Sequence, residues 1–132
     1  MTGFTIKPID EMQTINHGST KLAGAELGVE SFGIQVFDFP PGFADYPEHD
    51  HSHDGHEEVY VVLRGSAEFE IDGERVPIDP QRMLRIAAGS KRRLQPGPDG
   101  VRILAIGSSP GSPYVRPEGL RLSAGDRWPR SS

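Results

Sequence analysis

The stretch PEHDHSHDGHEEVYVVLRG, residues Pro47 to Gly65, has an unusual density of side chains that bind metals. The ten residues that end at Glu58 contain that carboxylate and four of the chain's five histidines: His49, His51, His53 and His56. Imidazole and carboxylate groups are common ligands of divalent transition metals. This stretch therefore predicts a metal site built from residues that are close in the sequence.

The spacing of the histidines indicates how such ligands converge. Side chains two residues apart point to the same face of an extended strand, so His49, His51 and His53 are expected to project the same way. A turn at Asp54-Gly55 then reverses the chain, and Glu58 approaches the same point from the next strand. This arrangement predicts three or four nitrogen and oxygen ligands from a single hairpin.

The pattern His51-x-His53-x4-Glu58-x6-Gly65 resembles the first motif of the cupin superfamily. With the strand pattern described below, the resemblance covers residues 30–107. It implies an all-β domain, a double-stranded β-helix or jelly-roll barrel, with the metal site inside the barrel.

The element that precedes this motif in the family is also present, as Pro40-Pro41-Gly42. The loop from there to His51 is longer than the family pattern expects. Taking His49 as the first ligand shortens the loop but leaves too long a gap to Glu58. His51 and His53 are therefore the preferred ligands, and His49 stays an open alternative.

The second motif of the family is only partly matched. It contains a Pro-x-Gly turn and a histidine that completes the metal site, whereas the segment after Gly73 reads Asp79-Pro80-Gln81-Arg82. The position of the family's histidine falls on Arg92, and an arginine stays protonated and cannot bind a metal. The fourth ligand is then missing, or it is supplied by His49 or His56.

Two side chains are candidates for binding a small molecule. Tyr60 shares the face of Glu58 in a regular strand, and a buried tyrosine hydroxyl needs a hydrogen-bond partner. Arg92 is either a surface charge or a cation in the pocket, where it binds a carboxylate or phosphate or pairs with Glu58. Tyr60 and Arg92 are therefore the predicted substrate-binding residues.

Sixteen glycines and twelve prolines leave little room for helix, and the extended segments are short. Strands are predicted at Ser31–Phe39, Val59–Leu63, Ala67–Ile71, Glu74–Ile78, Met83–Ala87 and Val101–Ile106. The strongest hairpin signal between them is Asp72-Gly73, and the turn-rich Gln95–Gly100 is expected to precede the last strand. Short strands at this spacing indicate an all-β sandwich or barrel.

A chain of 132 residues is expected to form one domain. Within it we expect a weakly patterned N-terminal arm over residues 1–30, in which Ile9–Met12 forms a helical turn. The barrel is expected over residues 31–107, and an arm rich in Pro, Ser and Gly over residues 108–132. This arm is expected to pack on the barrel or a partner through its larger residues: Tyr114, Leu120, Leu122 and Trp128.

Composition excludes several classes of protein. There is no cysteine for thiol or disulfide chemistry, and the longest apolar run of five residues is too short for a membrane span. A net charge of −5 argues against sequence-independent binding of nucleic acid. A cytoplasmic location is expected, and the resemblance implies a homodimer in which exposed strand edges are covered.

Two classes of function follow from these residues. A His-His-Glu set with open positions suits Fe(II) and O2 chemistry or polarisation of a carbonyl, so the first class is a metal-dependent oxygenase or isomerase acting on a small molecule. The second is a non-catalytic module that binds or senses a small anion without a complete metal site. The ligand set does not distinguish Fe, Mn, Ni and Zn.

Overall fold

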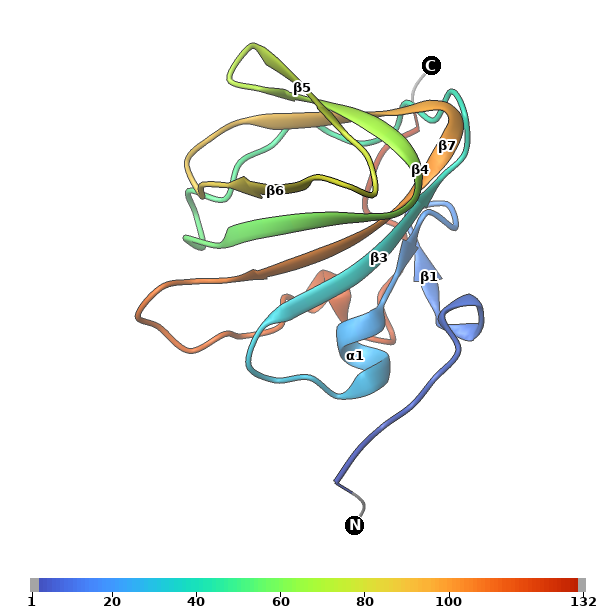
Figure 1. The fold of residues 1–132 in the computed structure, drawn as a ribbon. Helices are drawn as coiled ribbons and strands as arrows, with labels where there is room; N and C mark the ends of the chain where they lie inside the picture. The colour runs from blue at the N-terminus through green and yellow to red at the C-terminus, as the bar shows by residue number, and fades with distance from the viewer. Residues whose placement is uncertain (1–2, 131–132) are drawn as a thin grey trace.

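In the computed structural model, which describes residues 3–130, seven strands belong to one antiparallel sheet that folds back on itself (Figure 1). The strands are β1 (Thr14–Ile15), β2 (Thr20–Lys21), β3 (Gly33–Phe39), β4 (Glu57–Ile71), β5 (Glu74–Ile78), β6 (Met83–Ile86) and β7 (Arg92–Ser108). The helical segments of this part of the chain are α1 (Ala23–Leu27) and the 3-10 helices Ile9–Glu11 and Glu118–Leu120. The predicted all-β class is confirmed.

The two longest strands, β4 and β7, join two layers because each contributes to both. The first half of β4 pairs with β6 and with the second half of β7, whose other edge carries β3, then β2 and β1. The second half of β4 pairs with β5 and with the first half of β7. The main core contains buried side chains of both layers, including Phe37, Phe39, Tyr46, Tyr60, Val62, Phe69, Ile86, Leu94 and Ile103.

The turn-rich segment Gln95–Gly100, expected to precede the last strand, lies within β7. Pro96 pairs with Ala67 of β4 and Val101 pairs with Gly65, so five steps along β7 correspond to only two steps along β4. The residues of β7 between these two pairs therefore bulge out of the ladder. A bulge bends a strand while pairing continues on both sides, and this allows β7 to pass from one layer to the other. For the same reason the separate strands expected at Val59–Leu63 and Ala67–Ile71 form one strand, β4.

Gly65 and Gly100 meet where the bulge brings β4 and β7 together. Gly65 has a φ of 78°, and a Cβ at this position would lie 2.2 Å from the carbonyl oxygen of Gly100. Real side chains do not reach such a distance, so the close approach of the two backbones requires glycine.

Gly65→Ala is therefore expected to reduce the free energy of unfolding by roughly 1–3 kcal/mol more than Gly73→Ala, because overpacking adds to backbone strain. Gly73 is the matched control, since its φ is 86° but a Cβ there would meet nothing within 4 Å. Urea denaturation of the two variants measures the difference. Equal destabilisation by both substitutions would contradict the close-contact explanation.

The N-terminal segment covers the outer face of β3. Val36 packs there in a second apolar cluster with Met12 and Ala23, while Phe37 and Phe39 point into the main core. The strand is thus buried on both faces, and the predicted helical turn at Ile9 is confirmed. The sequence pattern does not reveal α1, which has only five residues and no side-chain cap.

The C-terminal arm returns to the barrel and is anchored near its end. The side-chain oxygen of Asn16 accepts hydrogen bonds from the backbone N–H groups of Arg127 and Trp128, at 2.8 and 3.0 Å. The Asp126 carboxylate accepts one from the backbone N–H of His17 at 3.1 Å and lies 3.0 Å from its Nδ1. These contacts connect the arm to the N-terminal strands.

The ring of Trp128 packs on the main core, as expected for this arm. Its centre lies 5.3 Å from that of Tyr46 and 6.0 Å from that of Phe37. Leu122, also expected to pack, is 44% exposed. Trp128 is therefore the principal apolar anchor at the end of the arm.

The attachment of the arm is expected to depend on pH through Asp126. The hydrogen bond from the backbone of His17 lowers the pKa of this carboxyl. A carboxyl with a lowered folded-state pKa stabilises the attachment above its ordinary pKa, and the contribution is lost as pH falls through the lowered value. We expect the arm to loosen below about pH 4.

The fluorescence of Trp128, the only tryptophan, reports this release, and far-UV circular dichroism follows the barrel. Asp126→Asn should abolish the acid step in fluorescence that precedes barrel unfolding. The same step in both proteins would contradict a role for Asp126.

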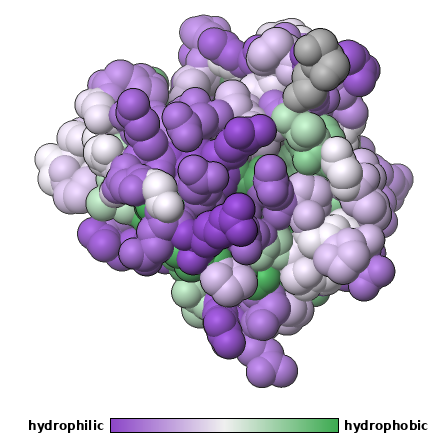
Figure 2. Space-filling view, turned by 90° about the horizontal axis from the view of Figure 1, so that it is seen from above, coloured by the Kyte–Doolittle hydropathy of each residue, from purple (hydrophilic) through white to green (hydrophobic). Residues whose placement is uncertain are grey.

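The face of the molecule seen in Figure 2 is mostly hydrophilic, with hydrophobic residues visible in small gaps. Exposed large apolar side chains come from separate elements and include Ile6, Leu63, Met83 and Val115. Single apolar residues of this kind are normal on a surface. Among the described residues no helix has the length and apolar character needed to cross a membrane. The homodimer and the cytoplasmic location stay predictions.

Candidate metal centre

The histidine-rich loop runs beside the start of β7. The backbone N–H of His49 donates to the carbonyl of Arg92 at 3.1 Å, and the N–H of Arg92 donates to the carbonyl of His49 at 2.9 Å. The N–H of His51 donates to the carbonyl of Ala88 at 2.7 Å. The position of both histidines is therefore set by a segment far away in the sequence.

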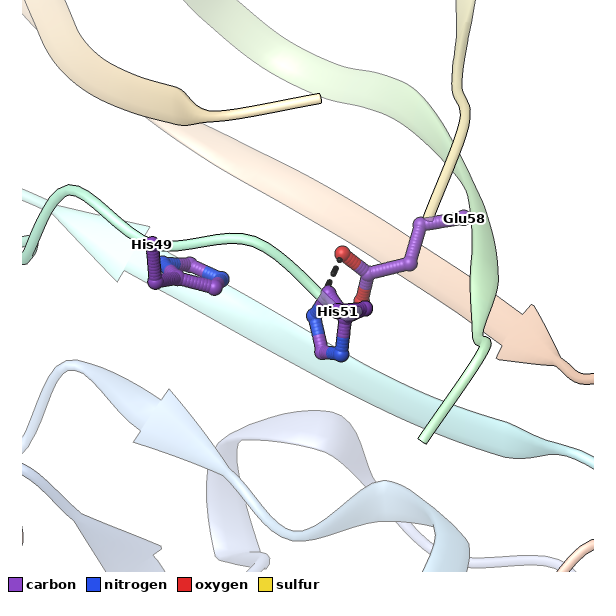
Figure 3. A group of neighbouring side chains, drawn as sticks. All are labelled: His49, His51 and Glu58. Carbon is purple, nitrogen blue, oxygen red and sulfur yellow. Dashed lines mark ion pairs between the residues drawn. The ribbon is translucent and has the colours of Figure 1, made fainter. Parts of the chain in front are cut away.

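His49, His51 and Glu58 form a group of possible metal ligands (Figure 3). Each offers one ligand atom, and these atoms lie within 4.8 Å of one another. His51 Nε2 is 3.1 Å from Glu58 Oε1, and the ring centres of His49 and His51 are 5.2 Å apart. Figure 3 shows His51 turned toward Glu58, with His49 beside it on the same loop. Ligand atoms this close to one another can face a single ion, for which bonds to nitrogen and oxygen are about 2.0–2.2 Å.

Both imidazoles of this group are hydrogen bonded through Nδ1. His49 Nδ1 donates to the carbonyl oxygen of Pro47 at 2.8 Å, and His51 Nδ1 lies 3.2 Å from each carboxylate oxygen of Asp54. A ring nitrogen that faces an acceptor carries the proton, so Nε2 of the neutral His49 ring keeps its lone pair. His51 Nε2 lies 3.1 Å from Glu58 Oε1 and also faces an acceptor, so it offers a lone pair to an ion only after it loses its proton. Metal-binding histidines are oriented in this way, and the donor set therefore fits a metal ion.

The three members of the group differ in the charge that their surroundings favour. Burial lowers the pKa of His49, which favours its neutral form. Burial acts in the same direction on His51, but hydrogen bonds and charges from Glu58 and Asp54 outweigh it and raise the pKa of His51. Burial disfavours the charged form of Glu58, but contacts with His51, Tyr60 and Arg92 keep its pKa below the ordinary value. The site thus contains an ionised carboxylate.

Arg92 is fully buried and pairs with Glu58. Its Nη1 donates to Glu58 Oε1 at 2.7 Å, and the side chain is 0% exposed. Its Nη2 and Nε donate to the carbonyls of Ala87 and Ser90, at 2.8 and 3.1 Å. Of the two alternatives from the sequence, the surface charge is excluded by this burial. Arg92 does not line the cavity in front of the histidines, so its contacts hold Glu58 and do not reach a ligand there.

Tyr60 lies in the wall of that cavity, and its hydroxyl is also engaged by Glu58. It donates to Glu58 Oε1 at 2.7 Å and lies 3.4 Å from the hydroxyl of Tyr46. The hydroxyl therefore has the partner that burial requires, and Tyr60 both lines the cavity and orients Glu58.

His53 is not brought into the group. The turn begins directly after His51, where the N–H of Gly55 donates to the His51 carbonyl at 2.7 Å, so the extended alternation stops before His53. The His53 side chain is 74% exposed and lies at the edge of the cavity. The expected common face of His49, His51 and His53 is therefore wrong for the last of these. His56 belongs to a second group, with His51 and Asp54.

Sequence reasoning missed Asp54, which it treats only as a turn residue. Its carboxylate lies within 3.4 Å of ring nitrogens of His51, His53 and His56. It also accepts a hydrogen bond from the backbone N–H of His56 at 3.0 Å. The sequence signal for Asp54 is an aspartate in a tight turn with histidines on both sides. An aspartate side chain in such a turn accepts a hydrogen bond from the nearby backbone, and this bond fixes its direction.

A cavity of about 360 Å³ lies in front of the group. One side of it is formed by the candidate ligands and Tyr60, and another by residues of the C-terminal arm. The remaining wall contains aromatic and aliphatic side chains: Ile15, Phe37, Tyr46 and Pro47. Such a cavity, apolar with a few converging polar groups, is typical of a small-molecule site.

The fold and this site define a small β-barrel protein with a candidate metal centre. The model of the cupin domain matches residues 35–107, which is more than half of the chain. The chain therefore belongs to the cupin family. A search of the curated proteins found no match.

Solved structures share this fold. A cupin protein from Bacteroides fragilis aligns with a TM-score of 0.69 and 22% identity, over 89% of this chain and 93% of that one. A putative sugar phosphate isomerase from Acidithiobacillus ferrooxidans aligns with a TM-score of 0.55 and 21% identity, over 73% and 58%. The cupin domain of an XRE family transcriptional regulator from Enterobacter cloacae gives 0.53 and 21%, over 63% and 86%. These likenesses confirm the predicted double-stranded β-helix and show the fold alone.

Arg92→Met is expected to reduce the free energy of unfolding by roughly 3 kcal/mol, because the Glu58 carboxylate stays buried without its cation. Arg85→Met is the matched control. Arg85 pairs with the neighbouring Glu57, but the two side chains are 64% and 41% exposed, so the expected loss is at most about 1 kcal/mol. Urea denaturation at neutral pH measures both values. Small and equal losses would show that the buried pair does not stabilise the site.

Proposed function

We propose that the chain binds a divalent first-row transition metal ion through His49, His51 and Glu58, beside a cavity that takes a small molecule. The observation that carries the proposal is the convergence of His49, His51 and Glu58 on one point, with both Nδ1 atoms held by acceptors. Metal-binding histidines in proteins are held in this way. An ion at this point replaces the proton that His51 Nε2 shares with Glu58. Fe, Mn, Ni and Zn all accept such a ligand set.

The residues of the site have separate tasks in this proposal. Arg92 and Tyr60 keep Glu58 ionised and oriented, and Asp54 keeps the proton of His51 on Nδ1. Arg92 occupies the place of the family's fourth ligand, so the protein supplies three ligands and leaves positions open to water or a small molecule. When bound, the ion supplies Lewis acidity toward an oxygen atom of the ligand.

Activity as an oxygenase or isomerase on a small molecule is the finer form of this proposal. The alternative is a non-catalytic module that binds or senses a small anion without metal. The Arg92–Glu58 pair favours this alternative, because it occupies one oxygen of the only carboxylate in the group formed with His49 and His51. Metal analysis separates the two.

The test compares metal binding by the protein and its variants. His49→Ala, His51→Ala and Glu58→Gln should each weaken binding of Zn2+ or Ni2+ by roughly tenfold or more, because each removes one ligand. His53→Ala is the matched control, an exposed histidine two residues from His51 whose removal should leave the affinity unchanged. Isothermal titration calorimetry and elemental analysis of the purified proteins give the affinity and the stoichiometry.

Two results would contradict the metal site as proposed: full binding after both His51→Ala and Glu58→Gln, or loss of binding after His53→Ala. Failure of the unaltered protein to bind either ion would support the metal-free alternative. Circular dichroism of each variant shows that the fold is retained.

A further inference from the structure

The cavity has an outer wall that lies beyond the matched cupin residues 35–107. This wall is built by the C-terminal arm and consists of Pro117, Gly119, Leu120, Arg127 and Trp128. The arm is anchored on Asn16 and His17, and these hydrogen bonds hold its backbone at residues 126–128 against the barrel. The arm is therefore part of the binding site.

Arg127 is an exposed residue that lines this wall and supplies a positive charge to it. Its backbone N–H is held by Asn16 at 2.8 Å, and its side chain lies over Gly119, where a Cβ would come within 2.2 Å of Nη1. Within residues 3–130 its guanidinium has no carboxylate partner. An arginine in a cavity wall without an acidic partner is suited to bind a carboxylate with two parallel hydrogen bonds.

The other charged side chains around the cavity have hydrogen-bonding partners within the protein. Glu58 is paired with Arg92, and the Asp54 carboxylate lies within 3.4 Å of three imidazoles. Arg127 is thus the charge left for a ligand, and an ion at the proposed metal site adds further positive charge. A cavity of this kind favours an anion over a neutral or cationic molecule.

Between Arg127 and the histidines the cavity is aromatic. The rings of Trp128, Tyr46 and Phe37 lie within about 6 Å of one another, centre to centre, and all three line the space. Aromatic walls of this type contact flat apolar groups through stacked or edge-to-face arrangements. The ligand is thereby expected to have an apolar body as well as a charge.

We propose that the cavity binds a small carboxylic acid with a flat apolar body, and that Arg127 and Trp128 determine this preference. Arg127 binds the carboxylate and Trp128 contacts the body, while the opposite end of the ligand faces His49, His51 and Glu58. This last contact rests on the proposed metal function, whereas the preference itself does not. A volume of about 360 Å³ suits one ring with a short acidic group.

Benzoate, benzamide and acetate test the preference, because they separate the charge from the apolar body. Quenching of the single tryptophan, Trp128, reports binding, and titration calorimetry gives the affinity independently. Benzoate should bind saturably and roughly tenfold more tightly than either other probe, a difference of about 1.4 kcal/mol. Arg127→Gln should weaken benzoate binding by about tenfold and leave benzamide binding unchanged.

Arg130→Gln is the matched control, since Arg130 is exposed on the same arm and does not line the cavity. Its affinity for benzoate should equal that of the unaltered protein. Trp128→Ala, followed by calorimetry, should weaken benzoate and benzamide equally, because it removes contact with the ring and not with the charge. Benzoate binding no tighter than benzamide binding, or an equal loss of both in Arg127→Gln, would overturn the proposal.

Each titration is made on chelator-treated protein and on protein incubated with Zn2+. If the protein fails to bind Zn2+ and still prefers benzoate in a way that depends on Arg127, that result would support this inference and contradict the proposed metal function. Normal binding of Zn2+ without any preference for benzoate would overturn this inference and leave the metal function intact.

Discussion

The buried ion pair between Arg92 and Glu58 is the interaction on which the candidate site depends. Arg92 pairs with His49 through its backbone and with Glu58 through its side chain, so one residue positions two of the three candidate ligands. Its remaining hydrogen bonds go to the carbonyls of Ala87 and Ser90. A buried charge destabilises a protein unless it is paired and hydrogen bonded, and this requirement ties the histidine loop to β4 and β7.

Arg92 stands where the family has a metal-binding histidine, yet the candidate ligands His49, His51 and Glu58 are still held together. A histidine at position 92 would offer a lone pair, whereas arginine offers a permanent charge and hydrogen-bond donors. The pair therefore leaves three candidate ligands in the proposed site while it keeps the Glu58 carboxylate ionised and oriented. His49 and His51 are held independently, by Pro47 and Asp54.

The cavity beside these ligands depends on contacts outside the barrel strands. The bulge at Gly65 and Gly100 lets β4 and β7 serve both layers, and this creates the space in which the core aromatic residues and the ligands face each other. The outer wall then comes from the C-terminal arm, to which Asn16 contributes two hydrogen bonds from the backbone of Arg127 and Trp128. The two ends of the chain therefore complete a site whose ligands lie in the middle of the sequence.

Local patterns in the sequence were sufficient to predict the all-β class, most strand positions, the family and the region of the candidate site. Alternation of apolar residues, glycine turns and the spacing from His51 to Gly65 are properties of neighbouring residues. Only the tertiary structure places His49 rather than His53 beside His51 and Glu58, because His49 pairs with Arg92 and a turn directs His53 outward. The burial of Arg92 and the place of Trp128 in the cavity were decided there as well. Each depends on contacts between residues far apart in the chain, and no local pattern encodes such contacts.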